Sequence, residues 1–135
     1  MIVILDADGQ YAHLIARRIR EIGVPFTVLP MDMSWRDYPE GVKGIILTGG
    51  AASVHSSMAP EPDPRIWNSM VPILGICYGM QIMALKMGGR VAKRRNDCGI
   101  TEFLTVTSGF LQEDDELDLN IFNDAGYRFQ VLMSH

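Results

Sequence analysis

The chain has 135 residues, 47% hydrophobic and 21% charged, which suits one packed domain and is too short for two. Its formal net charge of -4 argues against a nucleic-acid-binding protein, because the basic cluster Lys93-Arg94-Arg95 is too short to reverse the acidic balance. The two cysteines form neither a disulfide framework nor a zinc pattern, and no apolar run approaches the roughly 18 residues that cross a bilayer.

These properties predict a single domain over residues 1–135 in a reducing cytoplasm, with no signal peptide, membrane segment or metal site. The first half of the chain then alternates strand and helix patterns. Ile2–Leu5 is a continuous apolar run typical of a strand buried on both faces. Residues 10–22 have helical periodicity and place four apolar side chains along one side: Leu14, Ile15, Ile19 and Ile22.

Further strands are predicted at residues 26–29, 44–48 and 72–76. A short helix is expected around residues 65–70, between prolines, and a longer one after Gly79. Strands that alternate with helices in this way predict a mainly parallel sheet with helices on both faces.

The second half has a different pattern. Residues 100–106 and 128–133 have strand character, and the acidic, turn-like stretch 112–118 separates them. Without a convincing helix after Met87, these strands predict an antiparallel extension of the parallel sheet. The pattern stops at His135 directly after a strand, so we expect the chain to be a fragment.

The most informative segment is Gly75-Ile76-Cys77-Tyr78-Gly79-Met80-Gln81, which joins a predicted strand to a predicted helix. A cysteine with a glycine two residues before it and another two residues after it has the layout of a nucleophile elbow. The tight turn lifts the reactive atom clear of the sheet, and the N-terminus of the following helix favours a thiolate there. Cys77 is therefore predicted to be a nucleophile.

Two other segments should lie beside this elbow, because ligands bind beyond the carboxyl ends of the strands in open parallel sheets. They are Asp6–Tyr11 after the first strand and Thr48–Val54 after the third. The N–H groups of the Gly49-Gly50 loop and of Tyr78 could together form an oxyanion hole. Such a hole would suit acyl transfer, in which negative charge develops on a carbonyl oxygen.

The elbow resembles the nucleophile motif of the class I, or triad, glutamine amidotransferases. Three other stretches, in this order, resemble the amidotransferase part of the GMP synthetases, and the likeness covers nearly the whole chain. They are Asp6…Gly9-Gln10-Tyr11 with residues 14–18, residues 44–54 (GIILTGGAASV), and residues 131–135 (VLMSH). The resemblance implies a three-layer, flavodoxin-like α/β fold.

The resemblance also implies a mechanism. Cys77 would attack the side-chain amide of glutamine, release ammonia and form a glutamyl thioester that water hydrolyses. Gly50 and Tyr78 would hold the oxyanion. The substrate would be held by Gln81 and Gly49, and by the backbone around Ser134 and His135. A partner synthetase would use ATP and magnesium to convert XMP to GMP, and the amidotransferase domain itself would need no cofactor.

The sequence departs from the family pattern in three places. Ala51 stands where a proline commonly follows the glycine pair, and Asp6-Ala7-Asp8-Gly9 replaces the usual first loop. The family's base comes from a His-Pro-Glu segment downstream of the Ser134-His135 pair, beyond the last residue of this chain. Without this base and its orienting partner, the cysteine would lose much of its activation.

Several alternatives stay open. The acceptor enzyme could instead make anthranilate, carbamoyl phosphate or CTP. The missing base also suits a non-catalytic regulatory subunit, and the elbow alone suits a single-cysteine hydrolase. The remaining residues have simpler interpretations: Cys98 is structural, His13 lies on the surface, His55 fills a loop, and Met80, Met83 and Met87 fill the core.

Overall fold

The computed structural model describes the backbone of residues 1–91, 98–104 and 128–134, and the side chains of residues 1–91. The chain divides into two compact units, Met1–Ala92 and Lys93–His135. Cys77 and the two strand-end segments predicted to lie beside it, Asp6–Tyr11 and Thr48–Val54, belong to the first unit. Among the described helices, none is long and apolar enough to cross a membrane.

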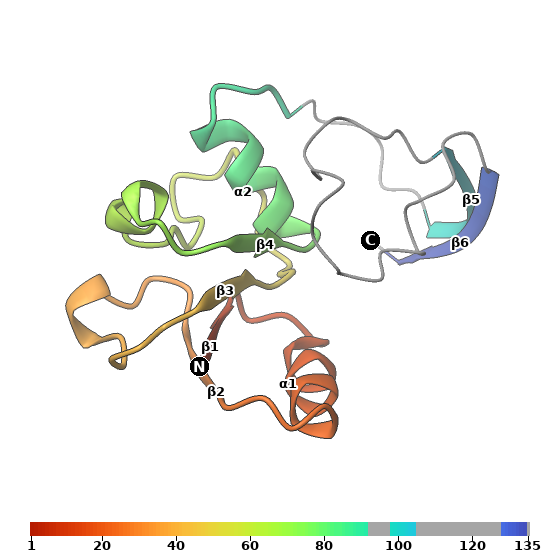
Figure 1. Ribbon diagram of the computed structural model, residues 1–135. Helices are drawn as coiled ribbons and strands as arrows, with labels where there is room; N and C mark the ends of the chain where they lie inside the picture. The colour runs from red at the N-terminus through yellow and green to blue at the C-terminus, as the bar shows by residue number, and fades with distance from the viewer. Residues whose placement is uncertain (92–97, 105–127, 135) are drawn as a thin grey trace. The chain divides into compact units, whose positions relative to one another are not determined.

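The first unit is built on a four-stranded sheet in the order β2-β1-β3-β4 (Figure 1). All neighbouring strands are parallel, with Ile4 opposite both Val28 and Ile46. The strands are β1 (Ile2–Asp6), β2 (Phe26–Pro30), β3 (Gly44–Leu47) and β4 (Ile73–Gly75). The predicted parallel sheet is confirmed, and its order changes direction between β1 and β3, which is where open α/β sheets place their ligands.

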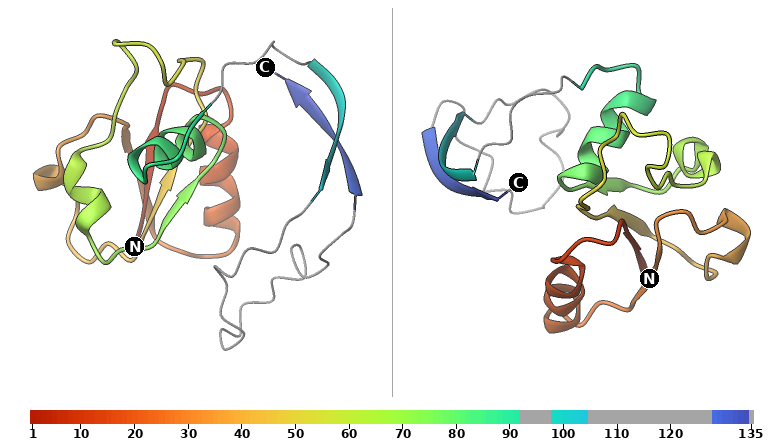
Figure 2. Two further views of the ribbon diagram at one scale, coloured as in Figure 1. Left: turned by 90° about the horizontal axis from the view of Figure 1, so that it is seen from above. Right: turned by 180° about the vertical axis from the view of Figure 1, so that it is seen from behind.

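Helices cover both faces of this sheet (Figure 2). Helix α1 (Ala12–Glu21) packs Ala16 and Ile19 against Ile4 of β1. The opposite face carries α2 (Tyr78–Lys86) and two short 3-10 helices, η1 (Trp35–Asp37) and η2 (Pro64–Asn68). There Val3, Leu5 and Leu47 are fully buried. The predicted three-layer arrangement is therefore confirmed.

The face of α1 that contacts the sheet agrees with the prediction at Ile15 and Ile19 and differs from it at Leu14 and Ile22. The buried positions are Ala12, Ala16 and Ile19, whereas Leu14 is 43% exposed and Ile22 is 73% exposed. Residues 12, 16 and 19 follow the helical spacing of four and three residues, so they share one side. Small alanine side chains allow the helix to approach the sheet closely, and the larger Leu14 and Ile22 lie outside that contact.

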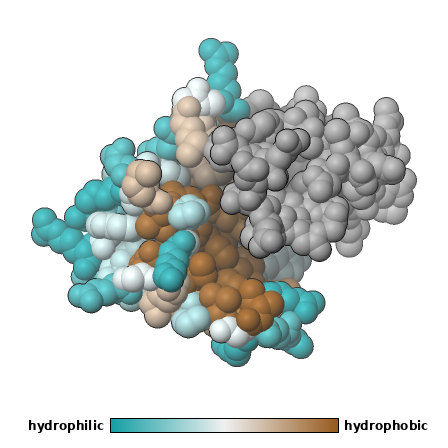
Figure 3. Space-filling model, in the orientation of Figure 1, coloured by the Kyte–Doolittle hydropathy of each residue, from teal (hydrophilic) through white to brown (hydrophobic). Residues whose placement is uncertain are grey.

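Two other helix predictions need correction. The short helix predicted around residues 65–70 is the 3-10 helix η2, and α2 begins at Tyr78, immediately after the cysteine. Met80 and Met87 are 53% and 66% exposed, so they do not fill the core as predicted. On the side of the first unit drawn in Figure 3, apolar residues in brown form a patch with polar residues around it.

The second unit contains β5 (Cys98–Leu104) and β6 (Arg128–Ser134). These strands pair antiparallel over seven positions, from Cys98 opposite Ser134 to Leu104 opposite Arg128. The two predicted strands do pair antiparallel, but they form a two-stranded sheet of their own, whereas the sequence predicted an extension of the parallel sheet. The acidic stretch 112–118 lies outside the described residues.

Candidate active site

Cys77 occupies the sharp turn between β4 and α2. It is the N-cap residue of α2, with φ 53° and ψ -113°, and it is partly exposed. A positive φ is strained for any residue with a Cβ, at a cost of about 1–3 kcal/mol, and such strain clusters at functional sites. This conformation is the one expected of a nucleophile elbow, so the predicted local structure around Cys77 is confirmed.

The glycines that flank Cys77 are required by close packing. A Cβ at Gly79 would lie 2.3 Å from the carbonyl oxygen of Leu47, and a Cβ at Gly75 would lie 2.7 Å from the backbone nitrogen of Met80. The first contact lets α2 begin directly against β3, and the second lets β4 run straight into the turn. Both glycines therefore allow the turn that presents Cys77.

The Gly49-Gly50 loop follows β3 and lies next to this turn. A Cβ at Gly49 would lie 3.2 Å from the Cβ of Cys77 and 3.6 Å from its Sγ. A Cβ at Gly50 would lie 2.3 Å from the carbonyl oxygen of Ala7, so Gly50 packs against the loop after β1. The structure thus brings together the three strand-end segments that the sequence predicted to be neighbours.

Two backbone donors in this region are available to a ligand. In the described part of the chain, neither the N–H of Gly50 nor that of Tyr78 donates a hydrogen bond. Tyr78 is the first residue of α2, and the unsatisfied N–H groups and dipole of a helix N-terminus favour negative charge. The arrangement has the donors that a developing oxyanion beside Cys77 would need.

A polar cluster joins the loops that follow β1 and β3. The hydroxyl of Thr48 accepts a hydrogen bond from the N–H of Ala7 at 3.0 Å, and it can donate to Gly49 O at 3.0 Å or to Asp6 Oδ1 at 3.3 Å. The same carboxylate oxygen of Asp6 accepts a hydrogen bond from the N–H of Gly9 at 3.2 Å. Sequence reasoning assigned no role to Thr48 or to the Asp6 carboxylate.

The buried side chain of Tyr78 anchors the first residue of α2 to the rest of the first unit. Its side chain is 1% exposed, and its hydroxyl donates a hydrogen bond to Pro60 O at 2.5 Å. Burial, followed by the nearby Glu61 carboxylate, raises the pKa of Tyr78. Glu61 in turn pairs with Lys86 at the other end of α2, at 2.7 Å. Segment 60–61 thus contacts both ends of the helix that carries the candidate oxyanion donor.

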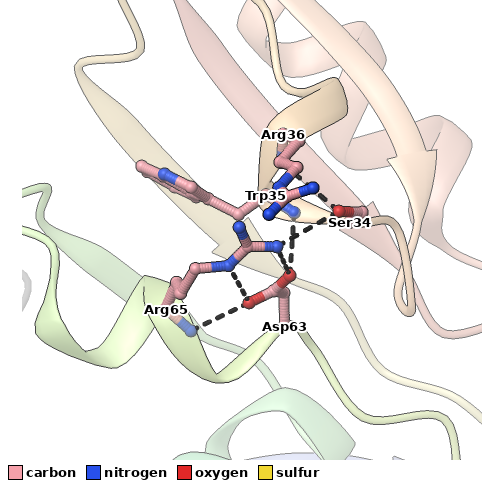
Figure 4. A network of polar contacts seen from close by, with 5 residues as sticks. All are labelled: Ser34, Trp35, Arg36, Asp63 and Arg65. Carbon is pink, nitrogen blue, oxygen red and sulfur yellow. Dashed lines mark hydrogen bonds and ion pairs between the residues drawn. The ribbon is translucent and has the colours of Figure 1, made fainter.

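Two residues after Glu61, Asp63 attaches the start of η2 to η1 (Figure 4). Its carboxylate accepts hydrogen bonds from the backbone N–H of Trp35 and from the backbone and side chain of Arg65, and Arg65 also reaches Ser34 Oγ at 3.2 Å. The hydrogen bonds from Arg65 and from the N–H of Trp35 hold the pKa of Asp63 well below its usual range. This network joins the start of η2 to η1.

The other predicted site residues lie as follows. Gln81 is one helical turn after the nucleophile, and its N–H donates to Cys77 O at 3.0 Å. Ser134 is the last residue of β6, and His135 lies outside the described residues. His13 and His55 are exposed on α1 and in the loop after Gly50, in agreement with their predicted surface positions. Within the described residues, no group of three or more metal-ligating side chains could hold a metal ion.

Comparison with known proteins identifies the family. Residues 3–135 match the family described as glutamine amidotransferase class-I. A GMP synthase [glutamine-hydrolyzing] of Syntrophomonas wolfei is 52% identical over 135 residues, which is 99% of this chain and 25% of the relative. Its counterpart in Borreliella burgdorferi is 42% identical over 136 residues, again 99% of this chain and 25% of the relative.

A solved structure agrees with these relatives. A protein of Thermoplasma acidophilum that is described as one of the subunits of a GMP synthase superposes with a TM-score of 0.67 at 27% identity, covering 97% of this chain and 62% of that one. The chain therefore spans about a quarter of the length of the two curated relatives, in a region that folds alike. By its sequence and by its fold, this chain belongs to the class I glutamine amidotransferases.

Proposed function

We propose that this chain supplies the glutamine site of a glutamine-hydrolysing GMP synthase. The observation that carries the proposal is the strained turn at Cys77, φ 53°, beside the Gly49-Gly50 loop. The names of the relatives support GMP as the product of the whole enzyme. The Gly9-Gln10-Tyr11 and Met133-Ser134-His135 segments resemble those of the GMP synthetases. They therefore support a synthetase that makes GMP over one that makes anthranilate, carbamoyl phosphate or CTP.

The chemistry begins with the thiolate of Cys77. Its Sγ attacks the carbonyl carbon of the glutamine side-chain amide, and the carbonyl oxygen becomes an oxyanion that accepts hydrogen bonds from the N–H groups of Gly50 and Tyr78. The carbon–nitrogen bond then breaks, and nitrogen leaves as ammonia after it takes a proton from a general acid. Water then gives a proton to a general base as it adds to the thioester, the carbon–sulfur bond breaks, glutamate is released, and the thiolate is regenerated.

The remaining roles follow the family pattern. Gln81, Gly49 and the backbone around Ser134 and His135 would hold the substrate. By the resemblance, the general acid and base would come from the family's His-Pro-Glu segment. Ammonia would pass to a synthetase that activates XMP with ATP and magnesium. The reaction would take place in the cytoplasm, where free thiols persist.

The experiment that tests this proposal separates the two nitrogen sources. The full natural chain, with its synthetase, is supplied with XMP, ATP and magnesium, and with either glutamine or an ammonium salt. Cys77→Ala is expected to abolish GMP formation from glutamine and to retain formation from ammonium. Equal loss with both sources would contradict the proposed division of labour. Glutamine-dependent GMP formation that survives Cys77→Ala would exclude the proposed nucleophile.

A further inference from the structure

We propose that Thr48 is a positioning residue for the oxyanion loop, an inference that rests on the proposed glutaminase function. Thr48 is the residue between β3 and Gly49, and its side chain is 1% exposed. Apart from Tyr78, it is the only buried residue with a polar side chain among the described residues. A hydroxyl is rarely buried unless it forms hydrogen bonds, so its partners indicate what it holds in place.

The contacts of Thr48 converge on the three segments of the site. Its N–H donates to Leu5 O at 3.0 Å, and its own carbonyl oxygen accepts from the N–H of Gly79 at 3.1 Å, inside the nucleophile turn. Its hydroxyl accepts from the N–H of Ala7 at 3.0 Å and can donate to Gly49 O at 3.0 Å. One residue thus joins the loop after β1, the glycine loop and the first turn of α2.

The hydroxyl has a specific consequence for Gly50. Ala7, whose N–H binds the Thr48 hydroxyl, is also the residue whose carbonyl oxygen would lie 2.3 Å from a Cβ at Gly50. The two backbones are therefore in contact, and the Thr48 hydroxyl fixes one side of that contact. When the hydroxyl is removed, the N–H of Ala7 stays buried without a partner, and the loops can relieve this cost only by separating.

A separation of these loops moves the N–H of Gly50 but not Cys77, which is held by the turn between β4 and α2. The first step of glutamine hydrolysis needs both groups, because the oxyanion forms as sulfur attacks. Alkylation of the thiol by iodoacetamide forms no oxyanion and needs only an accessible thiolate. The two reactions therefore report separately on the loop and on the cysteine.

The test compares Thr48→Val, which keeps the side-chain shape without the hydroxyl, with Thr48→Ser, which keeps the hydroxyl. The matched control is Thr27→Val on β2, at the opposite end of the sheet order from β4. Each variant is made in the full natural chain with its synthetase. Glutaminase kcat and KM, the rate of Cys77 alkylation by iodoacetamide and the melting temperature are measured for all of them.

Deleting one oxyanion donor costs about 10²–10³ in kcat, so displacing the loop that carries one is expected to lower kcat by about tenfold or more in Thr48→Val. KM and the alkylation rate are expected to stay close to wild type, and Thr48→Ser and Thr27→Val are expected to retain wild-type kcat. Thr48→Ala, which removes the hydroxyl through a smaller residue, is expected to repeat the loss if the valine variant fails to fold.

Three results would overturn the inference. The first is a wild-type kcat in Thr48→Val, and the second is an equal loss of kcat in the valine and serine variants. The third is a parallel fall in kcat and in alkylation, which would indicate general disruption instead of loop displacement. A wild-type enzyme that lacks glutaminase activity would refute the proposed function itself, and the role of Thr48 with it.

Discussion

Gly79→Ala tests whether the nucleophile turn depends on contact between α2 and β3. The added Cβ would lie 2.3 Å from Leu47 O and 2.5 Å from Leu47 Cβ, although real Cβ atoms essentially never approach closer than 3.0 Å. The carbonyl is therefore at least 0.7 Å too close (3.0 minus 2.3), and Leu47 cannot move freely because it is fully buried in β3. Overpacking of this kind costs typically about 1–3 kcal/mol.

Helix propensity acts in the opposite direction, but Gly79 is only the second residue of α2, so the gain from alanine is at most the value of about 1 kcal/mol for a helix interior. The clash involves the backbone of an inner strand, so we take its cost at about 3 kcal/mol and expect a net loss of about 2 kcal/mol in the free energy of unfolding. For a chain of this size such a loss lowers the melting temperature by about 8 °C.

The assay is urea denaturation of wild type and variant, together with the rate of Cys77 alkylation. Gly23→Ala is the matched control, because Gly23 has φ +73° and no atom within 4 Å of its added Cβ. It is expected to lose only about 1 kcal/mol, from the strained backbone, with unchanged alkylation. A Gly79→Ala variant as stable as wild type, or more stable, would refute the packing argument and leave helix propensity as the dominant effect.

Further predictions concern the polar groups behind the site. The Tyr38 hydroxyl is buried without a hydrogen-bond partner in the described structure, so Tyr38→Phe is expected to raise the free energy of unfolding by about 1 kcal/mol in urea titrations at pH 7. Burial, followed by the Asp63 charge, raises the pKa of Tyr38 from 10.0 to about 12, so the folded state disfavours the phenolate. Wild type is therefore expected to lose roughly 1–2 kcal/mol more than Tyr38→Phe as the pH rises from about 10 to 12, and equal losses would contradict this assignment. The pKa of Asp63 is depressed below its usual 3.8, so its stabilising effect is present above that pH and is lost as the pH falls through its folded value. Asp63→Asn should consequently lower the melting temperature at pH 7, and the gap from wild type should narrow below pH 3.8; a gap independent of pH would refute the role of its charge.

The sheet and the nucleophile turn could be predicted because their signals are local. Continuous apolar runs such as Ile2–Leu5 identify buried parallel strands without knowledge of their partners. The glycines at 75 and 79 predict the turn because few other residues fit beside so sharp a bend. The order of strands and helices then fixes the edge of the sheet at which the strand-end loops meet.

Other features could not be predicted, because they depend on distant contacts or on side-chain size. The Thr48 hydroxyl meets Ala7, 41 positions away, and Asp63 meets Trp35, 28 positions away. On α1, Ile15 and Ile19 were predicted correctly, but Leu14 and Ile22 were included in place of Ala12 and Ala16 because hydrophobicity ranks leucine and isoleucine above alanine, whereas close helix–sheet packing here also selects the two alanines. The exposed Met80 was taken for core because helical spacing alone does not indicate which face meets the sheet.

The most direct test of the account is the intact mass of the full natural chain, with its synthetase, after exposure to an electrophilic glutamine analogue. The proposed glutamine site predicts a single adduct that glutamine competes away, that Cys77→Ser lacks and that Cys98→Ser retains. An adduct that persists in Cys77→Ser, or no adduct on the wild-type chain under these conditions, would contradict a glutamine-specific nucleophile at Cys77.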